Sequence, residues 1–146
     1  MQSQPHSAAR PARSSKTVLI VDDVVDLLDS LVMLLQADGY EVVSAADGES
    51  ALRVAHEREV DLVVLDHRMP RKSGAEVAQV LDQSGPVRPK IVVHSAVPEG
   101  EIRRLWDGYD DFLEKPCPPG RLLATVADLL EVERRASTPT SMPRCE

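Results

Sequence analysis

The chain has few cysteines and no long apolar run, and both absences limit what it can be. No segment reaches the roughly 18 consecutive apolar residues of a membrane-spanning helix, so we expect no membrane partner. The two cysteines, Cys117 and Cys145, are too few for a disulfide framework, and Cys145 lies in a polar segment. A reducing, cytoplasmic compartment is therefore the expected location.

The two ends of the chain lack the apolar patterning of a folded domain. Residues 1–15 contain no apolar core of a secretory signal; their Ser and Arg content also occurs in organelle transit peptides, but we predict a disordered tail. Residues 133–146 are rich in Ser, Thr and Pro and are predicted to form a second disordered tail. The remaining residues, 16–132, suit one domain that can bury its own core.

Basic side chains are scarce in the predicted domain. The first 16 residues carry three basic and no acidic side chains, a net charge of +3, and the last 14 carry three basic and two acidic side chains, a net charge of +1. Because the whole chain has a net charge of −7, residues 17–132 have a net charge of −11. Direct nucleic-acid binding needs a basic footprint, so this balance argues against it. An acidic body suits a cation site or basic protein partners.

Short runs rich in Val, Ile and Leu alternate with segments of helical periodicity. The runs have the composition of parallel strands that are buried on both faces. Five such alternations predict an α/β domain with a parallel sheet. We expect a flavodoxin-like, doubly wound sheet of five strands in the order 2-1-3-4-5, with five helices. The predicted strands are residues 17–23, 40–45, 60–66, 90–96 and, more weakly, 110–115.

The helices between these strands carry their own start and stop signals. Capping residues and a first-turn proline mark helix starts, and a glycine marks a helix end. Residues 98–108 offer only a short fourth helix. The other signals are Leu27, Leu31, Leu34 and Leu35 before a stop at Gly39; Asp47 before Ala51, Leu52 and Ala55; a Ser73–Glu76 capping box before Val77, Val80 and Leu81; and Pro119 before Leu122, Leu123, Val126, Leu129 and Leu130.

Polar residues stand at the carboxyl ends of four of the predicted strands. They are Asp22, Asp23, Asp66, Ser95 and Lys115. Ligands of open parallel sheets bind at this edge, where the strand order reverses, so three carboxylates should converge there. Close, buried carboxylates repel each other unless a cation such as Mg²⁺ binds, which accepts carboxylate and phosphate oxygens. Together with a hydroxyl and an ammonium, these groups are the parts of a phosphoryl-transfer site.

Four motifs make the prediction specific: "VLIVDD", "LVVLDHRMPRKSG", "VVHSA" and "DDFLEKP". In their order and spacing they resemble the receiver domain of two-component response regulators, over about residues 16–132. The resemblance implies a phosphorylation site that uses Mg²⁺. Its implied residues are the phosphoacceptor Asp66; the metal ligands Asp22, Asp23, Asp66 and the backbone carbonyl of Arg68; the switch hydroxyl Ser95; the phosphate-pairing Lys115; and the aromatic switch residue Phe112.

The resemblance also covers the surroundings of this site. Met69-Pro70 and Gly74 match the loop after the phosphoacceptor, and Lys115-Pro116 matches a junction that is typically cis in the family. Arg68 and Val97 occupy variable positions that are expected to tune dephosphorylation. The interval from Ser95 to Lys115 is slightly shorter than is usual in the family, and the shortening falls in the surface used for signalling. We therefore do not expect the family's usual dimer arrangement in this chain, although a homodimer stays among the candidate partners.

Three further side chains near these motifs receive ordinary structural interpretations. We expect His67, beside Asp66, to be a solvated loop residue and not a second nucleophile. His94, on an apolar strand, is interpreted as a core or near-surface histidine. Cys117, after the Lys-Pro pair, is interpreted as a small hydrophobic residue and not as a redox centre.

The function implied by the resemblance is a signalling switch and not an enzyme. A histidine kinase or phosphotransfer protein would phosphorylate Asp66, and the output would be a change in binding to an unknown downstream protein. No output domain follows residue 132, which favours a stand-alone receiver.

Two alternatives remain open. One is a receiver-like binding module that does not use phosphorylation. The other, less favoured, is a phosphatase with an aspartyl nucleophile, although such enzymes commonly carry Asp-x-Asp where this chain has Asp22-Asp23-Val24. A dinucleotide site is disfavoured because the first strand–helix turn contains no glycine.

Overall fold

The fold was analysed in a computed structural model that describes residues 16–68, 73–82 and 88–136, with side chains described up to residue 131. Five parallel strands form one sheet in the order β2-β1-β3-β4-β5, as predicted. The strands are β1 (Thr17–Val21), β2 (Glu41–Ala45), β3 (Leu62–Leu65), β4 (Lys90–Ser95) and β5 (Asp111–Glu114). The helices are α3 (Val25–Ala37), α4 (Gly48–Glu57), α5 (Gly74–Asp82), α6 (Glu99–Leu105) and α7 (Pro119–Ala136).

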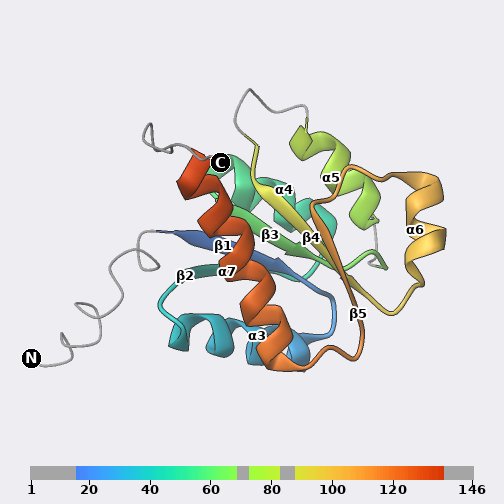
Figure 1. The fold of residues 1–146 in the computed structure, drawn as a ribbon. Helices are drawn as coiled ribbons and strands as arrows, with labels where there is room; N and C mark the ends of the chain where they lie inside the picture. Colours follow the sequence, from blue (N-terminus) through green and yellow to red (C-terminus); the bar gives the residue numbers. More distant parts are fainter. Residues whose placement is uncertain (1–15, 69–72, 83–87, 137–146) are drawn as a thin grey trace, which may run out of the picture.

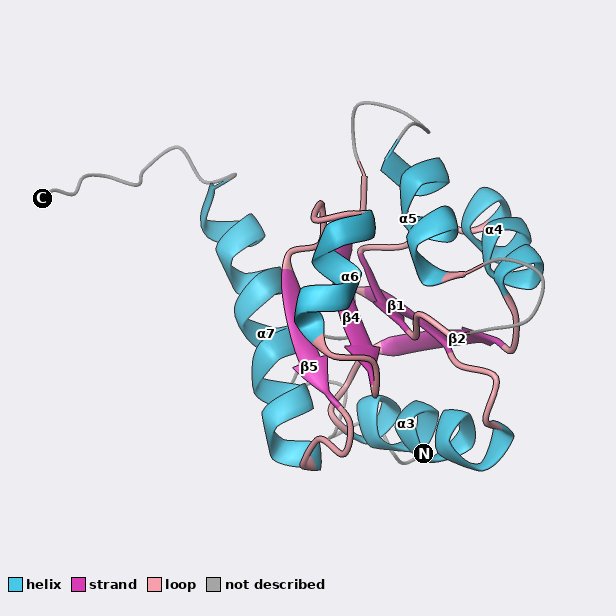
Figure 2. Ribbon diagram, turned by 90° about the vertical axis from the view of Figure 1, so that its right-hand side faces the viewer, coloured by secondary structure: helices cyan, strands magenta, loops and turns pink. Residues whose placement is uncertain are grey.

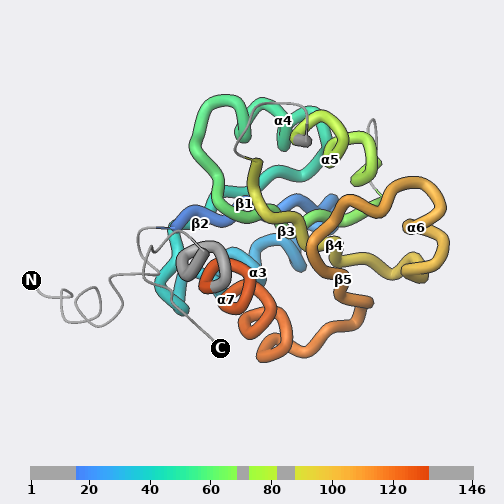
Figure 3. The backbone as a smooth tube through the Cα atoms, turned by 45° about the horizontal axis from the view of Figure 1, so that its top comes forward, coloured from blue at the N-terminus to red at the C-terminus, as the bar shows by residue number. Residues whose placement is uncertain are grey.

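The sheet is the middle layer of three. Helices α3 and α7 cover one face and α4 and α5 cover the other, as Figure 1 and Figure 3 show. Each face has its own apolar cluster: Leu35 and Val126 belong to the first, and Val77 and Leu81 to the second. Helix α6 lies beside the β4–β5 side of the sheet (Figure 2). Among the described residues, no helix is long and apolar enough to cross a bilayer.

The expectation that the first four strands are buried on both faces is wrong for β2, and the weaker fifth strand, β5, is also poorly covered. All residues of β3 are buried, but four of the five residues of β2 are exposed or half-buried. In β5 only Leu113 is buried. An edge strand has a neighbour on one side only and is covered less completely. Val80 on α5 was expected in the core, but its side chain is 45% exposed.

The capping signals are confirmed where the structure describes them. The Asp47 side chain accepts a hydrogen bond from the backbone N–H of Ser50, at 2.8 Å. Ser73 and Glu76 exchange hydrogen bonds of 2.9 and 3.2 Å, which is a capping box. Gly39 follows α3 with a φ of 103°, a conformation that favours glycine.

Some predicted boundaries differ from the observed ones. Helix α6 is shorter than the predicted 98–108, because the backbone at Trp106 is already extended. Helix α7 continues to Ala136, past the predicted end of the domain at residue 132. The rest of the predicted tails, residues 1–15 and 137–146, and the Met69-Pro70 pair lie outside the described residues.

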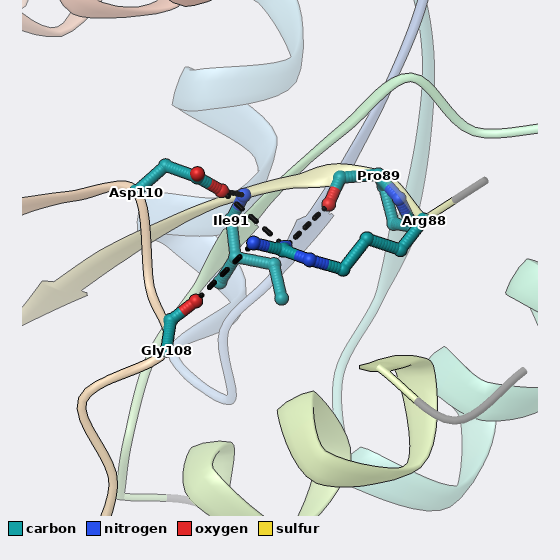
Figure 4. A network of polar contacts seen from close by, with 5 residues as sticks. All are labelled: Arg88, Pro89, Ile91, Gly108 and Asp110. Atoms are coloured by element: carbon teal, nitrogen blue, oxygen red, sulfur yellow. Dashed lines mark hydrogen bonds and ion pairs between the residues drawn. The ribbon is translucent and has the colours of Figure 1, made fainter. Parts of the chain in front are cut away.

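The connection from α6 to β5 is tied to the start of β4 by a polar network (Figure 4). The Asp110 carboxylate accepts the backbone N–H of Ile91 at 2.8 Å, while the Asp110 N–H donates to the Ile91 carbonyl at 2.7 Å. The Arg88 guanidinium donates to the Pro89 carbonyl at 2.9 Å and to Asp110 and the Gly108 carbonyl at 3.4 Å each. These contacts hold the entry to β5 beside the first residues of β4.

Candidate functional site

The acidic residues are placed by extensions of the sheet's hydrogen bonds. The backbone N–H of Asp22 donates to the Ala45 carbonyl at 3.2 Å, and that of Asp66 donates to the Val21 carbonyl at 3.0 Å. Both residues therefore leave the sheet at the same edge, one strand apart. The Asp22 carboxylate also accepts the N–H of Val24 at 2.9 Å, which directs the chain into α3.

The three predicted carboxylates converge at this edge. Asp22, Asp23 and Asp66 each offer a carboxylate oxygen, and these oxygens lie within 4.8 Å of one another. Asp22 and Asp66 are buried, with 1% and 6% of their surfaces exposed, whereas Asp23 is exposed. Burial removes water that would otherwise screen the repulsion between the carboxylates.

Lys115 reaches the same cluster from the end of β5. Its Nζ lies 2.8 Å from Asp22 Oδ2 and 3.4 Å from Asp66 Oδ2. The Lys115 N–H donates to the Ser95 carbonyl at 2.9 Å, and the peptide bond to Pro116 is cis, as expected. When all are ionised, three carboxylates and one ammonium leave a formal charge of −2.

The pKa of Asp66 is set mainly by its burial. Burial, with a contribution from the Asp22 carboxylate, raises the pKa of Asp66 above its usual value, although the Lys115 ammonium acts in the opposite direction. The donors of the cluster are all carboxylate oxygens, which hard cations prefer. The residues present therefore fit a divalent cation such as Mg²⁺.

The two predicted switch residues lie on β4 and β5. Ser95 is fully buried, and its Oγ accepts a hydrogen bond from the Val97 N–H at 3.1 Å. Phe112 pairs with Val93 in the sheet and is half-buried, and its ring centroid lies 6.0 Å from that of Tyr109.

The prediction for His67 is confirmed only in part, because it lies in a loop but its side chain is half-buried. The His67 carbonyl accepts the Gly74 N–H at 2.8 Å, and this turn places the imidazole beside Ile102 and Trp106. The Nδ1 atom is buried without a hydrogen-bond partner among the described residues, and burial lowers the pKa of the ring.

The interpretation of His94 as a core histidine is confirmed, and Cys117 has the apolar contacts of a small hydrophobic residue. His94 is buried, and burial, with a contribution from Lys115, lowers its pKa to about 4. Cys117 packs against the apolar cluster beneath α3 and α7.

The two variable positions line the same cleft. Arg68 is exposed and Val97 is buried, and both line a cleft of about 400 Å³ between the phosphoacceptor loop and α6. Leu105, on the same cleft, is 61% exposed.

One polar cluster near this edge was missed in the sequence. The Tyr109 hydroxyl donates to the Glu99 carboxylate at 2.7 Å, and Arg103 contacts the same oxygen at 2.9 Å. No short-range pattern signals the contact between Tyr109 and Glu99, because it joins the start of α6 to the loop that follows it.

The fold and these residues define a doubly wound α/β domain with an acidic site at the reversal of strand order. The family described as the response regulator receiver domain matches residues 18–127. The chain therefore belongs to the receiver domain family of two-component response regulators.

Curated relatives and solved structures agree with this family. The chain is 41% identical over 130 residues to the transcriptional regulatory protein PrrA of Mycobacterium tuberculosis, covering 88% of this chain and 54% of PrrA. It is 32% identical over 133 residues to the alkaline phosphatase synthesis transcriptional regulatory protein PhoP of Bacillus subtilis. This match covers 90% of this chain and 55% of PhoP. The chain thus spans about half the length of these relatives.

Two solved structures illustrate the likeness in three dimensions. A CheY-like receiver domain from Methanospirillum hungatei has a TM-score of 0.77 at 27% identity, covering 84% of this chain and 98% of that one. The response regulator TrrA of Thermotoga maritima, in complex with Mg(2+)-BeF, has a TM-score of 0.72 at 32% identity. The match covers 78% of this chain and 98% of the TrrA chain.

Proposed function

We propose that this receiver domain is a phosphorylation-dependent switch whose phosphoacceptor is Asp66. One Asp66 oxygen attacks the phosphorus of a phosphohistidine donor, and the P–N bond breaks. The bonding electron pair leaves with the imidazole nitrogen, which takes up a proton. The observation that carries this proposal is the contact of a buried carboxylate with Lys115, at 3.4 Å, beside two further carboxylates.

The fit of the acidic cluster to a divalent cation supports Mg²⁺ as the cofactor. Asp22, Asp23, Asp66 and the backbone carbonyl of Arg68 would hold it. When bound, Mg²⁺ supplies positive charge that offsets the carboxylates and the incoming phosphoryl oxygens. The Mg(2+)-BeF complex of TrrA, a relative of the same family, supports this assignment.

Three residues would convert phosphorylation into a signal. Lys115 would pair with a phosphoryl oxygen, and the Ser95 hydroxyl, which accepts the Val97 N–H, can still donate its own proton to another. Phe112 would then turn inward behind Ser95 and change the surface formed by α6, β5 and α7. Ser95→Ala should still be phosphorylated but should respond only in part.

Arg68 and Val97 are the residues that would control the lifetime of the phosphoryl group. Neither can orient the attacking water, because Val97 is apolar and Arg68 is cationic, so we expect slow self-dephosphorylation. Arg68→Asn combined with Val97→Glu should accelerate decay at equal Mg²⁺. An unchanged or slower decay would remove these residues from the proposal.

The proposed donor is a histidine kinase or phosphotransfer protein, and the output is altered binding to a downstream protein or to a second copy of this chain. The acidic charge of residues 17–132 supports protein partners over direct nucleic-acid binding and is compatible with a cytoplasmic location. A switch of this kind is not an enzyme in its own right.

Labelling with acetyl phosphate and Mg²⁺, or with a cognate phosphohistidine donor, tests the function directly. Intact-mass measurement should show one added phosphoryl group on the wild type and none on Asp66→Asn, because an amide is a poor nucleophile. Asp26→Asn, an exposed position on α3, is the matched control and should be labelled normally. Equal labelling of Asp66→Asn would refute the assignment, and an unlabelled wild type would favour a phosphorylation-independent binding module.

A further inference from the structure

Tyr109 joins both ends of the α6 segment to each other. Its hydroxyl donates to Oε2 of Glu99, the first residue of α6, at 2.7 Å. Arg103, one turn further along α6, donates to the same oxygen at 2.9 Å. The loop that leaves α6 is thus bonded to the turn where α6 begins.

The ring of Tyr109 also connects α6 with the switch aromatic residue. It lies 5.5 Å from the Trp106 ring in an edge-to-face arrangement at 62° and 6.0 Å from the Phe112 ring at 55°. Such aromatic pairs attract beyond the area they bury. Tyr109 is therefore in contact with the end of α6 on one side and with β5 on the other.

The neighbouring residue restricts the freedom of Tyr109. The Asp110 carboxylate contacts the Ile91 N–H and Arg88 (Figure 4), and the Asp110 N–H donates to the Ile91 carbonyl. The backbone beside Tyr109 is thereby attached to the sheet. A change in the contacts of Tyr109 is expected to move α6 and the Phe112 ring in preference to the loop itself.

The electrostatics favour a protonated phenol beside an ionised carboxylate. Burial and the Glu99 carboxylate raise the pKa of Tyr109, while the hydrogen bonds from Tyr109 and Arg103 lower the pKa of Glu99. A hydrogen bond to a charged acceptor is stronger than one between neutral groups.

We propose that Tyr109 is a positioning residue of the switch: bonded to Glu99, it holds Phe112 half-exposed and α6 against β5, and this contact opposes the inward turn of Phe112. The inference rests on the proposed function and adds a residue that the shared motifs do not contain. Loss of the hydroxyl should leave phosphorylation chemistry intact and should make switching easier.

The single tryptophan of the chain, Trp106, is a built-in reporter because it contacts the Tyr109 ring. Beryllium fluoride with Mg²⁺, the species bound to TrrA, serves as the probe, and Trp106 emission is recorded during titration. Tyr109→Phe keeps the ring and removes one hydrogen bond, so its half-saturating beryllium fluoride concentration should fall by roughly three- to tenfold. Glu99→Ala, which removes the acceptor, should give a shift in the same direction.

A double-mutant cycle separates this hydrogen bond from unrelated effects. Because both changes break one contact, the double variant should shift no further than either single variant. Glu41→Ala is the matched control. Glu41, on β2 and away from α6, forms a comparably exposed ion pair with Arg58 at the end of α4, so this variant should titrate as wild type.

The outcomes distinguish this inference from the proposed function. A wild-type protein that responds while Tyr109→Phe titrates identically or more weakly would overturn the role of Tyr109 alone. Additive shifts in the double variant would do the same. A wild-type protein that binds no beryllium fluoride would overturn both proposals.

Discussion

The acidic site and the α6–β5 corner use polar groups in opposite ways. The acidic site (Asp22, Asp23, Asp66 and Lys115) leaves a formal charge of −2 at a largely buried position. The α6–β5 corner (Glu99, Arg103 and Tyr109, with Arg88 and Asp110) pairs its carboxylates with donors at half-exposed and exposed positions.

The difference indicates what each region can do. A buried, uncompensated charge attracts a cation and an anion that the cation can bind, so changes there should alter ligand binding. A satisfied, partly solvated cluster contributes little free energy, and its contacts can be exchanged at low cost. Changes in the corner should therefore alter the balance between conformations.

The largest effect should follow from removal of two carboxylates from the acidic site. Asp22→Asn combined with Asp23→Asn should lower the rate of phosphorylation by acetyl phosphate at fixed Mg²⁺ by at least roughly a hundredfold, since even the loss of groups that only orient a metal ligand costs 10–100-fold. The Mg²⁺ affinity, measured by titration, and the phosphorylation rate, measured by intact mass over time, should fall together. An unchanged Mg²⁺ affinity would mean that the cation binds elsewhere.

A pair of glycine variants compares the folding demands of the two regions. An added Cβ at Gly74 would lie 2.6 Å from the Asp66 carbonyl oxygen and 2.8 Å from His67 Cα, so Gly74→Ala should destabilise the fold by about 2–4 kcal/mol. Gly100, within α6, has nothing within 4 Å of that position, and Gly100→Ala should stabilise the protein by about 0.5–1 kcal/mol. Urea unfolding measures the change in the free energy of unfolding for both variants. Equal changes would contradict the expected difference between the two regions.

The buried His94 beside the acidic site predicts a loss of stability in mildly acidic solution. Its pKa is lowered from 6.5 to about 4, so the unfolded chain binds more protons between these values and stability falls as pH falls through this window. From pH 7.5 to pH 5 this residue should account for about 2 kcal/mol of lost stability. His94→Leu should flatten the pH profile of urea unfolding, with His56→Gln, at an exposed position, as the control. A profile as steep as that of the wild type would assign the loss to other groups.

The smallest effects are expected in the corner itself. Asp110→Ala removes the acceptor of the Ile91 N–H and should destabilise the protein by about 1–2 kcal/mol. Arg88→Ala should cost less than about 1 kcal/mol, because its contact with Asp110 is 3.4 Å long and partly solvated. Thermal or urea unfolding distinguishes the two, and a larger loss for Arg88→Ala would reverse this ranking.

The expectations that were wrong or only partly confirmed have a common cause. The apolar composition of residues 40–45 predicted complete burial, although the expected strand order already placed this strand at an edge of the sheet, where one side has no neighbouring strand. Val80 has the spacing of a core residue on α5, yet the face it occupies is not covered. His67 is a loop residue as expected, but it is half-buried, and its Nδ1 atom is withdrawn from solvent next to residues of the α6 segment.

The sequence by itself determined the order of the elements and the identity of the residues at the strand ends. Both depend on local patterns: apolar runs, capping residues and the polar residue that follows each run. Since parallel strands expose their carboxyl ends at one edge, the convergence of Asp22, Asp66 and Lys115 followed from the strand order alone. The tertiary structure decided the half-buried position of His67, the degree of exposure of β2 and the contact of Tyr109 with Glu99. These features arise from the packing of one element on another, which no short-range pattern in the chain encodes.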